Sequence, residues 1–369
     1  MSSPAAPHAH AAPTSARPPT PPSHWQRWRA ELFGSAPRAL TSLLLLGLGG
    51  WALLRALDWA LLQAVFAPDL ARCHALDHAG ACWGVVTEKH RAILFGRYPH
   101  AQQWRPAIAT ALLLGLLLAS AWPRSWRAGP LGLALLWALV LGAFVFLMGG
   151  GLGLEVVPTS RWGGLPLSLL LACVGLGVAL PLGVLLALAR RSTGWPVLQM
   201  LAASYIELIR GVPLISVLFM ASFLLPLLLP WQPDVLLRVL IGISLFAAAY
   251  LAEVVRGGLQ NVPVGQIEAA RALGLKPWQV QREIVLPQAL RAVVPALMNS
   301  VIGTLKDTSL VTIVGLYELT GALGLALGGD ADWRPFYLEG YLFIAAIYWS
   351  LCFALSRYSR WIETRLRAR

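Results

Sequence analysis

Eight long apolar runs constrain the fold of this chain more than any other feature of its sequence. Each run is close to the roughly 20 residues that a helix needs to cross about 30 Å of hydrocarbon. Only helices and closed barrels satisfy every backbone polar group in hydrocarbon, and runs this long exclude a barrel. We therefore predict an all-α integral membrane protein with about eight transmembrane helices. The predicted spans are residues 40–66, 107–122, 130–149, 165–189, 211–230, 236–255, 293–316 and 339–356.

The composition agrees with a membrane location. Hydrophobic residues make up 57% of the chain, charged residues only 12%, and the mean hydropathy is +0.65. The net charge of +12 is carried mainly between the apolar runs and not in a stripe with interleaved aromatic residues. This distribution argues against a nucleic-acid partner. It is typical of a membrane protein that keeps positive charge on its cytoplasmic side.

The positive charges also predict the orientation of the chain. Most Lys and Arg residues fall in one set of alternate segments, which includes both ends of the chain and residues 257–291. By the positive-inside rule, both termini and the 257–291 loop face the cytoplasm, and the loop at residues 67–106 lies outside. Residues 1–39 are rich in Pro, Ala and Ser, so we expect a disordered cytoplasmic tail without a cleavable signal segment.

The predicted outer loop contains Cys73 and Cys82, together with His74 and His78. An oxidising compartment allows a disulfide between the two cysteines. Two alternatives stay open, namely two unpaired thiols or a metal site built from these four side chains. The order and spacing of the four residues match no common zinc pattern, so no metal is predicted there.

A polar segment between two apolar runs has the pattern of a short crosswise helix. Pro263 and Gly265 are expected to break the preceding helix, and residues 266–273 have the Ala and Leu content of a new one. We expect Glu268 in its first turn, where the helix dipole favours a carboxylate. Gly274 is expected to end the helix in the left-handed conformation.

Nine residues separate the segment Glu268-Ala-Ala-Arg-Ala-Leu-Gly274 from Ile284-Val-Leu-Pro287. This spacing resembles the cytoplasmic E-A-A-x3-G-x9-I-x-L-P signature (EAA loop) of the membrane subunits of binding-protein-dependent ATP-binding-cassette importers. The alternative, an ordinary amphipathic interfacial helix, does not require the Ile, Leu and Pro at that distance. The resemblance implies contacts to an ATPase subunit from Glu268, Ala269, Ala270 and Gly274, and anchoring of the loop on its own subunit by Ile284, Leu286 and Pro287.

Three further stretches, residues 205–214, 250–258 and 305–310, resemble the polar amino acid branch of these permeases. The resemblance implies that residues 161–369 form a methionine-permease-like (MetI-like) domain, the type I importer core of five helices, with its coupling loop at 257–291. Residues 40–160 then supply three N-terminal transmembrane helices. With the sequences Phe95-Gly-Arg-Tyr-Pro and Trp104-Arg-Pro, they resemble the M-type subunit of the general L-amino acid transporters of Gram-negative bacteria.

This resemblance implies a function and a set of partners. The function is broad-specificity transport of L-amino acids from periplasm to cytoplasm by alternating access, in the bacterial inner membrane. The partners are a second permease subunit, in a heterodimer or a homodimer, two cytoplasmic ATPase subunits and a periplasmic amino-acid-binding protein. None of the three lysines follows a glycine, so the chain has no G-x4-G-K-[ST] phosphate loop. We predict no enzymatic activity and no cofactor in this chain, with ATP and Mg²⁺ used by the ATPase subunits.

Ionisable residues at membrane depth are costly and therefore mark candidate functional positions. One interpretation is that Lys306 and Asp307, with Thr308 and Ser309 nearby, meet the charged groups of an amino acid. The other is that Lys306 and Asp307 satisfy each other or backbone carbonyls and hold the helix bundle. Glu253 and Arg256 are three residues apart on one helical face, which favours a structural pair. The alternative functions are an ion-coupled secondary transporter, for which no internal repeat is visible, and a non-transporting membrane scaffold. The candidate substrate path or gate consists of Lys306, Asp307, Thr308, Ser309, Glu207, Arg210 and Glu253.

Overall fold

The computed structural model describes residues 23–77, 79–192 and 194–367. His78 and residues 1–22 of the predicted tail lie outside the described residues. The chain divides into two compact units, the first made of Met1–Ala64 with Leu76–Ala81 and the second of Val65–Ala75 with Cys82–Arg369. Each unit has its own internal packing.

In the first unit, α1 (His24–Phe33) precedes the long helix α2 (Ala36–Leu57), which continues as a π-helix over Asp58–Leu62. Helix α1 lies in the segment for which the sequence predicts a disordered tail, so the structure differs from that prediction. The proline-rich composition ends before α1, which contains neither Pro nor Gly. The Ser42 hydroxyl of α2 donates to the Leu32 carbonyl at 2.9 Å and joins the two helices.

Seven helices in the described part of the chain are long and apolar enough to span a membrane. An eighth span is formed if a bent helix pair counts as one, which confirms the prediction of about eight. The bent pair replaces the straight helix predicted over residues 211–230. Its two halves meet at 108° because Gly211 and Pro213 interrupt the helix between them. The seven spans are Ala36–Leu62, Trp104–Ala121, Ser125–Gly149, Gly164–Arg190, Val235–Gln260, Pro277–Val314 and Arg334–Arg365.

The second unit is a helical bundle. Two π-helical turns interrupt it, Met220–Leu224 between α9 and α10 and Val280–Val285 between α13 and α14, and a 3-10 segment, Thr308–Val314, follows α14. Its α-helices are α3 (Leu70–Ala75), α4 (Gly84–Phe95), α5 (Trp104–Ala121), α6 (Gly129–Gly149), α7 (Gly164–Arg190), α8 (Pro196–Arg210), α9 (Leu214–Phe219), α10 (Leu225–Leu228), α11 (Val235–Gln260), α12 (Val264–Ala272), α13 (Pro277–Gln279), α14 (Leu286–Asp307), α15 (Leu319–Gly328) and α16 (Tyr337–Arg367).

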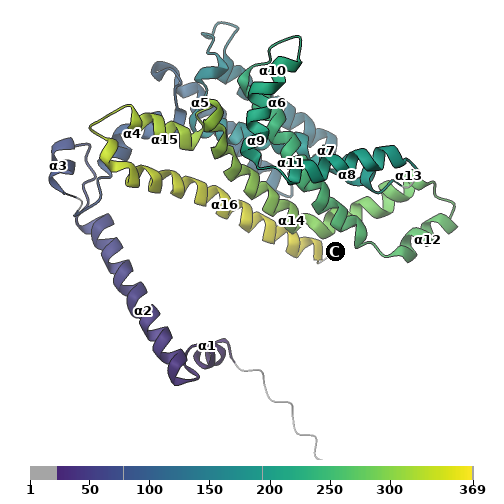
Figure 1. Ribbon diagram of the computed structural model, residues 1–369, viewed down its shortest axis with the longest axis horizontal. Coiled ribbons are helices and arrows are strands. Elements are labelled where there is room, and N and C mark those ends of the chain that lie inside the picture. Colours follow the sequence, from purple (N-terminus) through teal and green to yellow (C-terminus); the bar gives the residue numbers. More distant parts are fainter. Residues whose placement is uncertain (1–22, 78, 193, 368–369) are drawn as a thin grey trace, which may run out of the picture. The chain divides into compact units, whose positions relative to one another are not determined.

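Helix α11 is central to this bundle and packs along α7 on one side and α14 on another (Figure 1). The contact with α7 is close at Gly183, where an added Cβ would lie 2.9 Å from the Leu251 Cβ. Helices α5 and α6 share one hydrophobic core with α7, to which they contribute the fully buried Leu113 and Phe144. Residues 104–149 therefore belong to the same compact unit as the predicted permease core.

The bundle has two distinct ends. Figure 1 shows α12 and α13 at the end where α16 finishes, and α4 and α15 at the opposite end. Helix α14 runs from the first end to the second, and α16 runs back. The loop that carries the EAA pattern and the loop that carries Cys73 and Cys82 therefore lie on opposite sides of the bundle, as the alternation of spans predicts.

Candidate functional site

The polar loop forms a short helix that ends as the sequence predicts. Gly274 has a φ of +81°, in the left-handed region. Its N–H donates to the Arg271 carbonyl at 2.9 Å, and the N–H of Leu275 donates back to the Ala270 carbonyl at 3.2 Å. These bonds satisfy carbonyls that the helix end would otherwise leave unpaired.

The prediction that Glu268 lies in the first turn of α12 is wrong. The helix begins at Val264, directly after Pro263, and its first turn holds no acidic residue. Pro263 has the extended conformation of a residue that precedes a helix, and Gly265 is accommodated in the first turn without breaking it. Glu268 therefore lies one turn further on, where the helix dipole has less effect on its carboxylate.

The side chains of α12 separate into an outer and an inner face. Glu268 and Ala269 are exposed, and Leu273 just after the helix is 81% exposed. Ala270 is only 6% exposed and packs in a hydrophobic cluster with Val280 and others. This burial leaves Ala270 little surface for a partner, and its predicted contact with an ATPase subunit stays a prediction.

The segment after α12 anchors the loop, although not only through the predicted residues. Ile284 and Leu286 are half-buried against the same cluster as Ala270, whereas Pro287 is exposed at the start of α14. Val285, which the sequence analysis did not single out, is fully buried. A π-helical turn over Val280–Val285 brings these residues onto the bundle.

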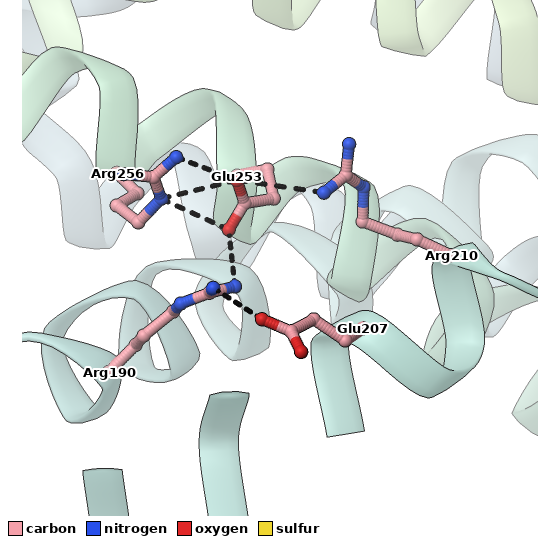
Figure 2. A network of polar contacts seen from close by, with 5 residues as sticks. All are labelled: Arg190, Glu207, Arg210, Glu253 and Arg256. Atoms are coloured by element: carbon pink, nitrogen blue, oxygen red, sulfur yellow. Dashed lines mark hydrogen bonds and ion pairs between the residues drawn. The ribbon is translucent and has the colours of Figure 1, made fainter. Parts of the chain in front are cut away.

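Glu253 of α11 is the centre of a charged network near the same end of the bundle (Figure 2). Its carboxylate accepts from Arg190 of α7 at 2.8 Å and from Arg256 of its own helix at 2.9 Å, and lies 3.6 Å from Arg210 of α8. Arg190 also reaches Glu207 of α8 at 2.8 Å. Three helices are thereby joined at one carboxylate.

The members of this network differ in exposure, which decides how much each pair stabilises the bundle. The side chain of Glu253 is 16% exposed and that of Glu207 is 66% exposed. Part-buried, charge-assisted bonds are the stronger ones, whereas an exposed pair contributes about 1 kcal/mol at most. The predicted Glu253–Arg256 pair is present. Glu207 and Arg210, predicted as a gate or an interfacial anchor, bond to Arg190 and Glu253 respectively.

Arg190 is a network member that sequence reasoning missed. It ends α7, and its only signal in the sequence is a positive charge at the predicted cytoplasmic boundary of a span. Such residues are usually assigned to membrane anchoring. Its two carboxylate partners come from other helices, so only the tertiary structure reveals them.

The remaining candidate path residues lie far from Glu253. With a rise of 1.5 Å per residue, Lys306 is about 30 Å along α14 from Leu286, near the opposite end of the bundle. Lys306 is exposed and Asp307 half-buried, and no ion pair joins them in the described part of the chain. Thr308 is buried, and its hydroxyl donates to the Leu305 carbonyl at 2.8 Å. Ser309, the next residue, is half-buried. The candidates therefore form two groups at different depths, and their place on a substrate path or gate stays a prediction.

The end opposite α12 is held by covalent and ionic links. Cys73 and Cys82 form a disulfide with a Cα–Cα distance of 5.4 Å, and the Cys82 N–H donates to Glu339 at 2.8 Å. Lys89 of α4 pairs with Asp330 after α15 at 2.7 Å, and this bond lowers the pKa of the Asp330 carboxyl. Within the described residues, no cluster of His, Cys, Asp and Glu could hold a metal ion.

Glu318 is a second residue that the sequence analysis missed. It is fully buried and caps α15, where one carboxylate oxygen accepts from the N–H groups of Thr320 and Gly321. The other oxygen accepts from Ser168 of α7 at 3.1 Å and from Tyr348 of α16 at 2.7 Å. These partners lie in α7, α15 and α16, so Glu318 joins three helices at the end of the bundle opposite α12, as Glu253 does near α12.

Comparison with known proteins gives a consistent result. The model of the family described as binding-protein-dependent transport system inner membrane component matches residues 179–368. The chain is 43% identical over 360 residues to the inner membrane amino-acid ABC transporter permease protein YhdY of Escherichia coli, covering 94% of this chain and 96% of that one. It is 36% identical to the glutamate/glutamine/aspartate/asparagine transport system permease protein BztC of Rhodobacter capsulatus, and the match covers 92% of this chain and 93% of that protein. Among solved structures, it is similar to a chain of an amino acid ABC transporter crystallised with histidines, with a TM-score of 0.48 and 28% identity. This match covers 62% of this chain and 97% of that one.

Proposed function

The chain belongs to the family of binding-protein-dependent transport system inner membrane components, and on that premise we propose that it is a permease subunit of an ATP-driven importer of L-amino acids. Two relatives that match almost the whole chain are amino-acid permeases by name, which supports this substrate class. The observation that carries the proposal is the exposed outer face of α12, which is fixed to the bundle by the buried Ala270.

The chain spans the inner membrane several times, and we assign both termini and α12 to its cytoplasmic side. The excess of Lys and Arg in the segments on that side supports the assignment. The disulfide loop then lies in the periplasm, where disulfides persist. This is also where a binding protein delivers substrate.

We assign the contact with a cytoplasmic ATPase to Glu268, Ala269 and Gly274. In this assignment the partner subunits bind ATP and Mg²⁺ and carry out hydrolysis, while this chain contributes the docking surface. The short side chain of Ala269 lets the groove of a partner approach the backbone closely, and the buried Val285 holds the loop while force passes through it.

The Glu253 network links that loop to the helices around the pathway. Helix α11 leads directly into α12, and Glu253 lies seven residues, about 10 Å, before its end. Movement of α12 therefore changes the geometry between Glu253 and Arg190 or Arg210 on neighbouring helices. We propose that these charge pairs rearrange as the permease alternates between outward and inward states.

Near the outer end, Lys306 and Asp307 are our candidates for the charged groups of the amino acid. Lys306 is exposed on α14 and is not engaged in an ion pair in the described part of the chain, so its ammonium is available to a carboxylate. The exposed face of α14 requires a cover in the membrane. A second permease subunit, which we infer to be a related but different chain, provides it.

The test is purification of the chain from its native membrane in mild detergent, followed by ATPase and uptake assays. Co-purification of ATPase subunits, and hydrolysis that rises when a loaded amino-acid-binding protein is added, would support the proposal. Uptake that follows an ion gradient without an ATPase would replace it with a secondary carrier. Absence of uptake under both conditions would favour a scaffold.

A further inference from the structure

A basic cleft lies beside the coupling loop, and neither the family nor the proposed transport function accounts for it. It has a volume of about 520 Å³ and opens between the end of α7 and the segment from α12 to the start of α14. We propose that this cleft binds the phosphate of an anionic phospholipid from the cytoplasmic leaflet. Its lining carries three arginines, Arg191, Arg271 and Arg282, and no Asp or Glu.

Most of the positive charge in the cleft is available to a ligand. One guanidinium nitrogen of Arg191 donates to the Leu259 carbonyl. This bond fixes the direction of the Arg191 side chain and leaves its other N–H groups available to a ligand. Arg271 is exposed and forms no ion pair in the part of the chain that the structure describes. Arg282 pairs with Glu283 at 3.4 Å, but the two side chains are 74% and 60% exposed, so this pair is weak. A phosphate replaces it readily because guanidinium groups bind phosphate oxygens in pairs.

The surroundings favour a lipid over a free phosphate ion. Leu188 and Leu286 add apolar surface to the cleft, and Trp278 in its lining is 57% exposed, as is typical of a tryptophan at a membrane interface. Beyond the cleft the chain enters α8, whose outer face exposes Val197 and Leu201. A lipid whose headgroup is held in the cleft therefore places its acyl chains along this face of α8.

The position of the cleft predicts a consequence for the coupling loop. Ile267 of α12 lines the cleft together with Pro277 and Gln281 from the segment that follows it. A bound headgroup therefore bridges α12 to the end of α7 through Arg271 and Arg191. The inference concerns lipid binding by this chain and holds whichever substrate is transported.

The test is native mass spectrometry of the full chain, titrated with phosphatidylglycerol in mild detergent. We expect a bound lipid that the Arg271→Gln/Arg282→Gln double variant holds about thirtyfold more weakly, since each arginine near an anionic surface contributes roughly fivefold. The matched control is Arg124→Gln/Arg127→Gln, which removes the same charge from two exposed arginines outside the cleft. The control should bind as tightly as the unmodified chain.

Two further ligands separate the sources of the phosphate. Phosphatidylcholine has the same tails without net charge and should bind weakly, and inorganic phosphate should compete only at far higher concentration. Equal binding of inorganic phosphate and phosphatidylglycerol would overturn the lipid assignment in favour of a soluble anion. Equal losses in both double variants, or no loss in either, would overturn the site itself.

A protein partner is the remaining alternative. If the Arg271→Gln/Arg282→Gln variant keeps its lipid but no longer co-purifies with an ATPase subunit, the cleft belongs to that subunit and the proposal fails. Should the double variant not insert, Arg282→Gln alone changes one exposed side chain and is expected to weaken lipid binding about fivefold. Unchanged affinity in that single variant would refute the proposal equally well.

Discussion

Replacing Gly274 by Val is expected to uncouple transport without unfolding the protein. Gly274 has a φ of +81°, and an added Cβ would meet nothing within 4 Å. The cost of the substitution therefore comes from the backbone conformation alone and not from a clash. For an L-residue in the left-handed region this cost is about 2 kcal/mol, and a β-branched residue is the least tolerant of it.

A cost of about 2 kcal/mol corresponds to a shift of roughly thirtyfold between the native loop and alternatives with negative φ. In those alternatives the bond from the Leu275 N–H to the Ala270 carbonyl is lost, and the chain leaves α12 in another direction. Substrate uptake should fall at least tenfold, while the amount of protein in the membrane stays the same, because Gly274 lies outside the buried core.

The assay is uptake of labelled amino acid by membrane vesicles, normalised to the amount of inserted chain. Gly274→Asn is the control, because asparagine tolerates the left-handed conformation far better than valine. It should retain most of the uptake. If the Val and Asn variants transport equally well, the left-handed end of α12 is not what positions the coupling surface. If the Val variant fails to insert, our estimate of a local cost is wrong.

Three further outcomes follow from the structure. Glu253→Gln should lower the free energy of unfolding by about 2 kcal/mol, because it leaves three arginines around a part-buried position. Glu207→Gln should lower it by less than about 1 kcal/mol, because that pair is exposed. Equal shifts of the two variants in thermal unfolding would contradict this ranking. Lys306→Met should reduce uptake without reducing the amount of inserted protein, and normal uptake of every amino acid would remove Lys306 from the path. Cys73→Ser should destabilise the loop that contains both cysteines by about 2.5 kcal/mol, as expected for closure of a short loop. Protease digestion of that loop at an unchanged rate would contradict this prediction.

Much of the fold was predictable because hydrocarbon restricts the choices so strongly. The spans follow from apolar length, and the end of α12 follows from a single glycine. The start of α12 was less predictable, since Gly265 is tolerated in a first turn and so does not mark a boundary. The 108° bend between α8 and α9 had a signal in Gly211 and Pro213, but the apolar run continues past both residues and hides it.

The site was only partly predictable, since most of its contacts join distant segments. The spacing of Glu253 and Arg256 on one helix is readable, but the pairing of Glu253 with Arg190 across 63 residues of sequence is not. Glu318 illustrates the same limit. An acidic residue in an apolar region is noticeable in the sequence, yet its role as a helix cap depends on partners in α7 and α16.

The packing around α11 suggests how movement at α12 reaches the membrane core. At Gly183 the backbones of α7 and α11 approach so closely that neither helix can slide without the other, which favours their motion as one body. Helix α8 packs on both of these helices, because its fully buried Ile206 shares one hydrophobic cluster with Ala187 of α7 and Ala252 of α11. The helix is interrupted after α8, at Gly211 and Pro213. We therefore expect relative motion at the bend between α8 and α9, while α7, α8 and α11 follow α12.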